Sequence, residues 1–340
     1  MELIPYRCGT CSYIHNFFNI FQIKKFRGWG RKRTGRFAAW CYRTFGGQLI
    51  LLEDGFIRSI GLGIEGSPLF SIVEDDVGIY YDATTPSRLE NILNTYDFLA
   101  DDNLMGTARE AIGLIRKHRI SKYNNASDVP EGYFGDEKGE GDGSRIKSGM
   151  TSEESGMTGR VLIIAQTAGD ASLIYGLGDT YTTDQMIDTA ITENPDAKIY
   201  LKIHPDVLTG KKRSDIDIDR AREKCIIIDQ NFNPISLLEY FDVVYTKTSQ
   251  MGFEALIMGK KCVCFGMPFY AGWGITDDRI SCERRKRSLG ADKIFAAAYI
   301  LYTRYNNPYA KRSSDIIDTI YEIVRQRHIQ QNRPINRKEF

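Results

Sequence analysis

The sequence has no long apolar run and little that would mark a membrane span, a secretory leader or a disulfide framework. No segment offers about 18 consecutive apolar residues, so we expect no membrane span. The N-terminus lacks the apolar core and small-residue cleavage site of a secretory signal. The seven cysteines are odd in number and scattered, which suits a reducing cytoplasm. We therefore expect a cytoplasmic globular protein whose 340 residues suffice for two domains.

Several enzyme motifs are also absent. There is no GxGxxG, no Walker lysine motif and no zinc-ligand spacing, which argues against a Rossmann dehydrogenase, a P-loop NTPase and a metalloenzyme. Cys8 and Cys11 form one CxxC without a second pair or a nearby pair of histidines, so a metal site there is disfavoured. Cys262 and Cys264 alternate along an expected buried strand and are predicted to be core residues.

A formal net charge of +1 hides an uneven distribution of charge. Residues 24–36 (KKFRGWGRKRTGR) carry seven positive charges, with Phe26 and Trp29 among them. A solvated basic helix or loop is the usual explanation of such a run. The interleaved aromatic residues favour a surface for an acidic partner, either anionic lipid headgroups, a polyanionic glycan or nucleic acid. Nucleic acid is the weakest of these, because no recognised nucleic-acid motif accompanies the run.

Composition divides the chain. Residues 122–159 are rich in Gly, Ser and acidic residues and poor in apolar anchors, which is typical of a linker or mobile loop. We expect an N-terminal Rossmann-like domain at 1–130, a linker at 131–159, a C-terminal Rossmann-like domain at 160–310, and a helix that crosses back with a basic tail at 311–340.

Apolar runs and their spacing predict an α/β protein. The expected strands are Gln48–Leu52, Phe70–Val73, Gly78–Tyr81, Arg160–Ile164, Lys198–Ile203, Cys225–Asp229, Phe241–Tyr245 and Cys262–Phe265. The expected helices are Ser87–Asn94, Leu104–Ile120, Thr183–Glu193, Pro234–Tyr240, Gly252–Met258, Ala291–Tyr305 and Asp315–Arg327, with Ser87 as an N-cap.

Polar motifs follow three strands of the second domain, at Gln166–Asp170, Lys202–Asp206 and Thr246–Glu254. Three such strand ends on one edge of a parallel sheet are typical of a ligand site. Thr248 and Ser249 begin a helix whose free N–H groups suit a phosphate, and Glu254 could accept from a ribose. Together these features suggest a nucleotide, and the alternative is an ordinary Ser-capped helix.

Further candidates lie at other strand ends. Glu53 or Asp54 could act as a general base and Arg58 could hold a sugar carboxylate, or the pair Asp54–Arg58 is an internal contact of a surface turn. His204, held by Pro205 beside Lys202, could donate to a phosphate or carboxylate, although a lone histidine is more often structural. The loop that holds Tyr270 and Trp273 could stack on a sugar or base, or form a packed hinge.

The motifs together resemble a known family. In order, the chain has EDGFIRSIGLG at 53–63, QTAGDAS at 166–172, KIHP at 202–205, SQMGFEAL at 249–256 and FGMPFYAGWGITDD at 265–278. Over residues 45–325 this resembles the KpsC-like β-Kdo transferases of capsule polysaccharide assembly. The best-known members carry two such modules in tandem, and this chain has the length of one.

The resemblance implies a GT-B fold, with two Rossmann-like domains and the active site in the cleft between them. It implies a retaining transfer from CMP-β-Kdo by double displacement through an aspartate adduct, without a metal or other cofactor. Lys202 and His204 would contact phosphate or the Kdo carboxylate, the helix start at Ser249 and Gly252 would hold phosphate, and Glu254 the ribose. Glu53 would be the acid/base, with Asp54 and Arg58 shaping the pocket. The acceptor would be an oligosaccharide or a lipid-linked glycan. From its charge, and not from the resemblance, we expect the basic N-terminal segment to meet a lipid-linked acceptor at an anionic surface on the inner face of the membrane.

One departure from the family affects catalysis. Where the family motif has Asp-Gln-Thr-x-Gly-Asp, this chain has Ala165, followed by Gln166 and, four residues on, Asp170. A methyl group cannot form a glycosyl ester, so transfer by that route is expected to be impaired. Ala165 is either an introduced substitution, which we favour, or a mark of a divergent member. Asp170 as a replacement nucleophile would need a shifted loop. A transferase for another CMP-activated acidic sugar and a glycan-binding module without catalysis stay open as alternatives.

Overall fold

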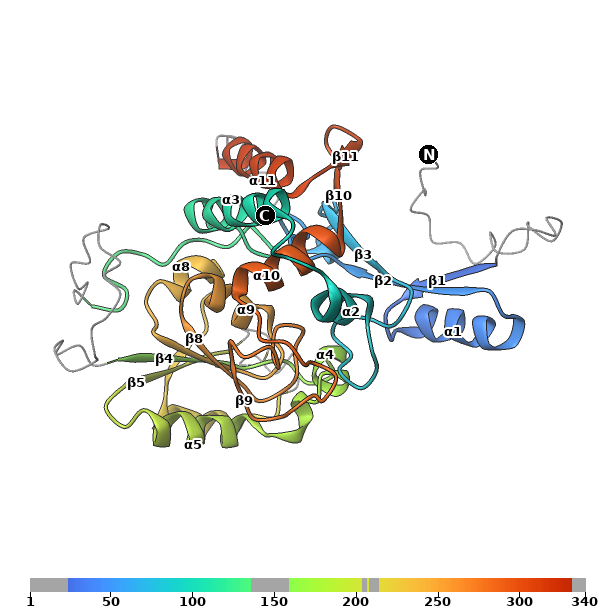
Figure 1. The fold of residues 1–340 in the computed structure, drawn as a ribbon. Coiled ribbons are helices and arrows are strands. Elements are labelled where there is room, and N and C mark those ends of the chain that lie inside the picture. Colours follow the sequence, from blue (N-terminus) through green and yellow to red (C-terminus); the bar gives the residue numbers. More distant parts are fainter. Residues whose placement is uncertain (1–23, 136–158, 204–206, 208–213, 332–340) are drawn as a thin grey trace.

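The computed structural model describes residues 24–135, 159–203, 207 and 214–331, which form two β-sheets with helices packed around them (Figure 1). The strands in these ranges are β1 (Lys25–Trp29), β2 (Gln48–Asp54), β3 (Ser71–Asp75), β4 (Arg160–Ile164), β5 (Lys198–Lys202), β6 (Ile226–Ile228), β7 (Val243–Thr246), β8 (Lys261–Cys264), β9 (Asp277–Asp278), β10 (Thr303–Asn307) and β11 (Arg312–Ser314). The α-helices are α1 (Arg33–Phe45), α2 (Arg88–Thr95), α3 (Asp102–His118), α4 (Ala171–Tyr175), α5 (Thr183–Glu193), α7 (Ile218–Lys224), α8 (Pro234–Leu238), α9 (Gln250–Ile257), α10 (Ala291–Phe295) and α11 (Ile316–Gln331). Short 3-10 turns occur at Gly63–Glu65 and Gly178–Thr180.

The second sheet is parallel throughout, with the strand order β6-β5-β4-β7-β8-β9. Alternate residues of β4 point to opposite faces: Val161 and Ile163 pack toward α5 and α7, and Leu162 and Ile164 toward α8 and α9. Figure 1 shows α5 below this sheet and α8 and α9 above it. Coverage on both faces explains why these strands read as continuous apolar runs, which made them predictable.

The first sheet is mixed, with the order β1-β2-β3-β10-β11. Only β1 and β2 are parallel, joined across α1, and the other neighbours are antiparallel. The sheet therefore differs from the Rossmann-like one expected for residues 1–130. Its last two strands come from the far end of the chain, because Thr303 pairs with Val73 and Tyr305 with Ser71.

The predicted helix Ala291–Tyr305 is wrong at its C-terminal end. The helix α10 continues as a π-helical turn, Ala296–Leu301, and β10 then begins at Thr303 within the range expected for the C-terminal domain. The expected C-terminal helix is present as α11, which packs on α3 beside the first sheet. Residues 136–158 of the expected linker lie outside the described ranges.

The predicted strand Gly78–Tyr81 is also wrong, because this segment is a turn. The Asp75 carboxylate accepts from the backbone N–H groups of Val77 and Gly78, each at 2.8 Å, and from that of Arg88. The N–H of Asp82 then donates to the carbonyl of Ile79 at 3.0 Å. A single carboxylate thus turns the chain despite the high β propensity of Ile79 and the two tyrosines that follow.

An aromatic cluster joins the parts of the molecule that carry the two sheets. Phe56, which follows β2, lies 4.7 Å from Phe269 and 4.8 Å from Tyr299 between ring centroids. Phe253 on α9 lies 5.1 Å from Phe269. These rings belong to one buried cluster that runs from β2 to α11. The two sheets are therefore connected by continuous apolar packing.

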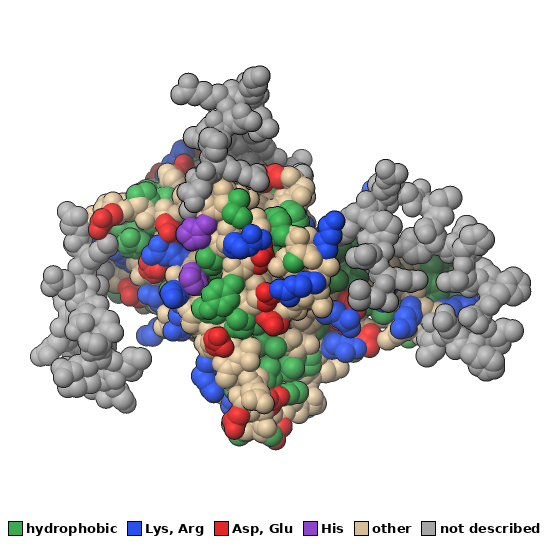
Figure 2. Space-filling view, turned by 90° about the horizontal axis from the view of Figure 1, so that it is seen from above, with side chains coloured by type: hydrophobic (Ala, Val, Ile, Leu, Met, Phe, Trp, Pro, Cys, Tyr) green, Lys and Arg blue, Asp and Glu red, His purple; other side chains and the backbone are tan. Residues whose placement is uncertain are grey.

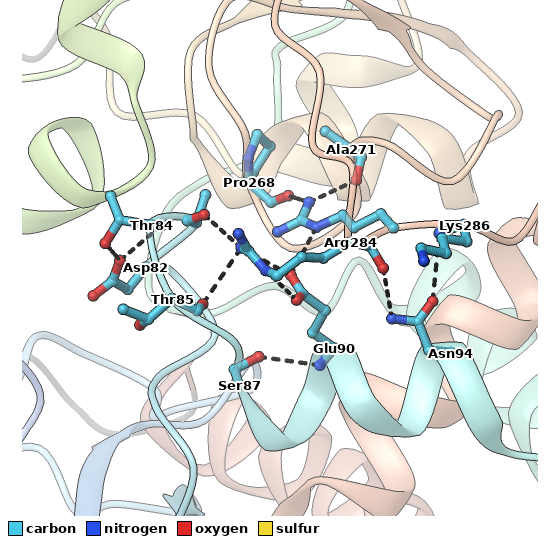
Figure 3. A network of polar contacts seen from close by, with 12 residues as sticks. Asp82, Thr84, Thr85, Ser87, Glu90, Asn94, Pro268, Ala271, Arg284 and Lys286 are labelled. Atoms are coloured by element: carbon cyan, nitrogen blue, oxygen red, sulfur yellow. Dashed lines mark hydrogen bonds and ion pairs between the residues drawn. The ribbon is translucent and has the colours of Figure 1, made fainter.

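Three arginines, Arg284, Arg285 and Arg287, attach the segment after β9 to α2, and we call this group the arginine latch. Figure 3 shows Arg284 beside Glu90 of α2. The Glu90 carboxylate accepts from Nε of Arg284 at 2.7 Å and from Nε of Arg285 at 3.3 Å. Arg285 also donates to the carbonyls of Pro268 and Ala271, and Arg287 donates to the carbonyls of Leu93 and Tyr96. The latch fixes the loop after β8 against the helices of the first sheet.

Among the described helices, none is both long and apolar enough to cross a bilayer. The predicted burial of Cys262 and Cys264 on β8 is confirmed. Cys8 and Cys11 lie outside the described residues.

Candidate functional site

The order of strands in the second sheet reverses between β4 and β7. The chain runs from β4 outward through β5 to β6 and then returns to place β7 on the other side of β4. In open α/β sheets, ligands bind beyond the carboxyl ends of the strands at such a point. The segments that begin at Ala165 and Lys247 therefore flank the position where a ligand is expected.

Hydrogen bonds bring predicted residues from these two strand ends together. The Gln166 side chain accepts from the backbone N–H of Thr248 at 2.8 Å and donates to the Thr248 hydroxyl at 3.0 Å. The hydroxyl of Ser172 lies 3.0 Å from the same hydroxyl. Gln166 and Thr248 thus form one polar cluster, as their places at neighbouring strand ends predict.

Asp170 and Ala165 lie on the same loop and differ in what they offer. Asp170 is exposed and caps α4, with its carboxylate accepting from the N–H of Ser172 at 2.9 Å. Ala165 is the first residue after β4, and its N–H donates to the carbonyl of Lys202 at 3.0 Å. Its methyl group packs against the core beneath the sheet. Position 165 therefore carries no group that could attack a sugar.

The strand end of β5 is described only in part. Lys202 donates to the carbonyl of Gln230 at 3.2 Å, and burial lowers the pKa of its ammonium group. His204 and Pro205 lie outside the described residues. Their assignments to donor phosphate or carboxylate stay predictions.

The sequence analysis did not single out Lys247, which follows β7 directly. Its side chain is buried, and its ammonium group lies 2.7 Å from the Asp215 carboxylate. Asp215 also accepts from the backbone N–H and the hydroxyl of Thr183. Burial alone would raise the pKa of Asp215, but the hydrogen bonds from Lys247 and Thr183 outweigh it and lower that pKa. The sequence did contain a feature that could have identified Lys247, because this lysine directly follows a buried strand and precedes Thr248.

The first sheet contributes carboxylates at the end of β2. Burial raises the pKa of Glu53, and the Lys32 ammonium group, 4.0 Å away, acts against this rise. Asp54 pairs with Arg58, whose Nε lies 2.9 Å from its carboxylate. This is the internal Asp–Arg contact considered as the alternative, so in this conformation Arg58 is already paired. Glu53 has the longer ion pair of the two carboxylates, 4.0 Å against 2.9 Å.

Tyr80 connects the two sets of residues. Burial raises the pKa of its phenol far above the ordinary value, and the negative charges of Glu53, Asp54 and Asp170 raise it further. Carboxylates that follow strands of both sheets therefore act electrostatically on one phenol hydroxyl. Within the described ranges, that hydroxyl has no hydrogen-bond partner. The sequence analysis missed Tyr80 because it assigned the segment to a strand.

The neighbouring Tyr81 is held in place by a close backbone approach. Its hydroxyl accepts from the N–H of Arg31 at 2.8 Å, and burial raises its pKa to about 12. Gly30 makes the approach possible, because a Cβ there would lie 2.1 Å from the Tyr81 oxygen and 3.0 Å from a Glu53 carboxylate oxygen. Glycine at position 30 thus keeps Tyr81 and Glu53 in one small region.

The start of α9 is a capped helix. The Ser249 hydroxyl accepts from the N–H of Met251 at 3.3 Å. Gly252 leaves room for the Tyr270 hydroxyl, which donates to the Ser249 carbonyl at 2.5 Å, because a Cβ on Gly252 would lie 2.2 Å from that oxygen. Trp273 donates to the carbonyl of Phe269 at 2.9 Å. Tyr270 and Trp273 are fully buried, so their rings form the packed hinge that was the alternative to stacking on a ligand.

Glu254 lies in the interior, with only 3% of its surface exposed. Its carboxyl accepts from the Ser121 hydroxyl at 2.6 Å and from the Gln250 amide at 3.4 Å. Burial raises its pKa to about 7, and the hydrogen bonds from Ser121 and Gln250 oppose this rise. In this conformation no part of the carboxyl is open to a ribose, so the structure gives the predicted ribose contact no support.

Comparisons with known proteins give one consistent result. Residues 26–305 match a family described as Capsule polysaccharide biosynthesis protein. The chain is 41% identical over 303 residues to the capsule polysaccharide modification protein LipA of Neisseria meningitidis serogroup A. That match covers 86% of this chain and 40% of the relative. It is 38% identical over 254 residues to the lipopolysaccharide-processing protein LpsZ of Rhizobium meliloti. That match covers 75% of this chain and 53% of the relative. The chain therefore spans about half the length, or less, of these curated relatives.

Two solved structures of Thermosulfurimonas dismutans KpsC are similar to the whole arrangement. One, titled a beta Kdo 2,4 transferase, is 44% identical with a TM-score of 0.75, covering 88% of this chain and 86% of that chain. The other, titled a beta Kdo 2,7 transferase, is 27% identical with a TM-score of 0.63, covering 89% and 85%. The predicted resemblance to KpsC-like transferases is confirmed, and so is the predicted GT-B class, although the first sheet is mixed and not Rossmann-like.

Proposed function

Because this chain belongs to the capsule polysaccharide biosynthesis protein family, we propose that it is a retaining β-Kdo transferase module acting in capsule polysaccharide assembly. It would move Kdo from CMP-β-Kdo to a glycan or glycolipid acceptor. The observation that carries the proposal is the hydrogen-bonded pair of Gln166 and Thr248 at the strand-order reversal of the second sheet. The higher identity to a 2,4 than to a 2,7 transferase, 44% against 27%, favours a 2,4 linkage.

The donor would lie across the ends of β4, β5 and β7. The CMP phosphate would be held by Lys202, by His204 and by the N-terminus of α9, whose dipole favours an anion. To reach the N–H of Thr248, the phosphate would replace the Gln166 side chain that now accepts from it. A lysine and a helix end can stabilise the negative charge of departing CMP, so we propose that the transfer needs no metal.

Retention of configuration calls for two displacements. A carboxylate at position 165 would attack the anomeric carbon of Kdo, the bond from that carbon to the phosphate oxygen would break, and CMP would leave with the bonding electrons. An acceptor hydroxyl, deprotonated by Glu53, would then attack the same carbon and release the carboxylate. The burial that raises the pKa of Glu53 suits a group that takes up and returns a proton.

The test is to place a carboxylate at position 165. We expect Ala165→Asp to form a covalent Kdo adduct, detected by intact mass, and to transfer Kdo to an acceptor with a 2,4 linkage detected by NMR. Ala165→Asn is the matched control, since it has similar size but cannot form the ester. If Ala165→Asp forms no adduct and Asp170→Asn abolishes the transfer made by the unmodified chain, Asp170 is the nucleophile and this assignment is wrong.

The absence of a carboxylate at position 165 favours a second candidate, a glycan-binding module without catalysis. Such a module would bind acidic oligosaccharides without CMP. Calorimetry with an acidic oligosaccharide, CMP-Kdo and CMP-sialic acid separates the cases. Preference for CMP-Kdo supports the Kdo transferase, preference for CMP-sialic acid indicates another CMP-sugar transferase, and binding of the oligosaccharide alone indicates the binding module. With a glycolipid acceptor, the site of action would be the cytoplasmic face of the inner membrane.

A further inference from the structure

The helix α1 lies at the outer end of the first sheet and packs on β1 and β2. Figure 1 shows it to one side of the molecule, away from the second sheet. Its buried side is a narrow row of small residues, Gly35, Ala38 and Cys41. Almost all the large side chains of this 13-residue helix therefore face outward.

Four of these side chains are large aromatics. Phe37 is 62% exposed, Trp40 50%, Tyr42 41% and Phe45 55%. The ring centroids of Phe37 and Trp40 are 5.8 Å apart and those of Trp40 and Phe45 are 6.0 Å apart, so the three rings form one patch. A contiguous exposed apolar patch on a folded protein marks an interaction surface rather than chance exposure.

Arginines border this patch on successive turns. Arg33, Arg36 and Arg43 are exposed, and with Trp40 they occupy one side of the helix at spacings of three and four residues. No guanidinium of the three has an ion-pair or hydrogen-bond partner in the part of the chain that the structure describes. Residues 24–52 contain eight Lys and Arg and no Asp or Glu. On the central part of the face in Figure 2, by contrast, acidic and basic side chains are interspersed.

We propose that the exposed face of α1 docks the protein onto an anionic lipid bilayer. A convex helix that presents aromatic rings between arginines fits a membrane surface: the rings enter the headgroup layer while the long Arg side chains reach the lipid phosphates. Small ligands such as sugars are instead held in concave sites. A second copy meeting this face by two-fold symmetry would bring arginines against arginines. The proposal rests on α1 and does not depend on Kdo transfer.

The experiment uses the full chain and vesicles of phosphatidylcholine, alone or with 30% phosphatidylglycerol. Co-sedimentation is expected with the mixed vesicles and to weaken as salt is raised, because exposed charges are screened. The triple variant R33Q/R36Q/R43Q should partition about 100-fold less, from about fivefold for each cation near an anionic surface. The matched control R109Q/R222Q/R304Q removes the same charge from exposed sites on other elements and should partition like the unmodified chain.

Trp40 supplies a second readout. Its fluorescence should shift to the blue on mixed vesicles, and Trp40→Phe should remove that shift while leaving co-sedimentation within about threefold of the unmodified chain, because an aromatic ring is retained. Trp273 is buried and will not report on lipid, and the half-buried Trp29 of β1 is replaced by Phe in both proteins so that Trp40 is the reporter. Unchanged far-UV circular dichroism will show that each variant is folded.

Three outcomes would overturn the proposal. Equal sedimentation with phosphatidylcholine alone would remove the charge requirement. Equal losses in the control and the α1 variant would mean that net charge, and not this face, is responsible. Light scattering that shows a dimer which R33Q/R36Q/R43Q dissociates, without vesicle binding, would assign the face to a second copy.

Discussion

Two basic segments of this protein look alike in sequence but differ in how many of their cations the fold pairs. Residues 24–36 carry seven positive charges and residues 279–287 carry five. The second segment forms the arginine latch, where Glu90 and backbone carbonyls take up the guanidinium groups of Arg284 and Arg285. In the first segment Arg31 pairs with Asp82 and Lys32 lies 4.0 Å from Glu53, whereas the arginines of α1 have no such partners among the described residues. What decides the fate of a basic run is whether the fold brings an acidic side chain and unsatisfied carbonyls within reach.

Removing the carboxylate of the latch should have the largest effect on stability. Glu90→Gln leaves Arg285, whose side chain is only 3% exposed, without its ion-pair partner. We expect a loss of about 3–5 kcal/mol in the free energy of unfolding, measured by urea denaturation. Glu74→Gln is the control, since its partner Arg304 is 73% exposed, and it should change that free energy by at most about 0.5 kcal/mol. Equal effects of the two substitutions would show that the latch does not hold the protein together.

Glu254 extends the comparison to a buried carboxyl that has hydroxyl and amide partners and no paired arginine. Its pKa in the folded protein is about 7, against 4.5 ordinarily, so the folded state binds a proton that the unfolded state releases. The resulting stabilisation is full below pH 4.5 and is lost as the pH rises through 7. Between pH 5 and 8 this group should lower the free energy of unfolding by about 3 kcal/mol. Glu254→Gln should remove that part of the pH dependence, and parallel pH curves for the two proteins would contradict the assignment.

Two tyrosines test whether a polar group with a hydrogen-bond partner contributes more to stability than one without. The Tyr302 hydroxyl donates to Asp75 at 2.8 Å in the interior, so Tyr302→Phe should cost about 1–3 kcal/mol of stability. Tyr80→Phe removes a hydroxyl that has no partner among the described residues and should cost little stability. In the A165D background we expect it to lower kcat for Kdo transfer about 100-fold, the smaller end of the range for a positioned proton donor. Steady-state kinetics checks this, and an unchanged kcat would separate Tyr80 from the site.

The smallest expected effect belongs to α1. Because Arg33, Arg36 and Arg43 have no internal partners among the described residues, R33Q/R36Q/R43Q should change the thermal unfolding free energy by no more than about 0.5 kcal/mol. Arg285→Gln, the same chemical change inside the latch, should cost several times more. A destabilised α1 variant would mean that this face is part of the folded interior.

Much of the second sheet was predictable from the sequence, and the physical reason is that helices cover both of its faces. Strands covered on both faces appear as apolar runs, and the helix Thr183–Glu193 is bounded as predicted, with Thr182 as its cap. The polar cluster of Gln166 and Thr248 also followed from strand ends alone. The strand β10 could not be predicted, because its pairing with β3 joins residues more than 200 positions apart.

Burial limited the prediction of the site. Glu254, Tyr270 and Trp273 have the chemistry of ligand-binding residues, but the packing of α9 against the loop after β8 places all three in the interior. That packing is a tertiary property which local sequence does not encode. Lys247 shows the opposite error. It is adjacent to the predicted site residue Thr248, is buried and pairs with Asp215, but the sequence analysis did not identify it.

The return of β10 and β11 to the first sheet sets the order in which the protein can fold during synthesis. One edge of β3 has no neighbour until Thr303 has left the ribosome, which takes on the order of ten seconds or more after β3 itself has emerged. The second sheet, whose strands are all made within that interval, can be complete first. A nascent chain halted before residue 303 would contain a folded second sheet and an unpaired edge of β3, the kind of surface that chaperones must shield.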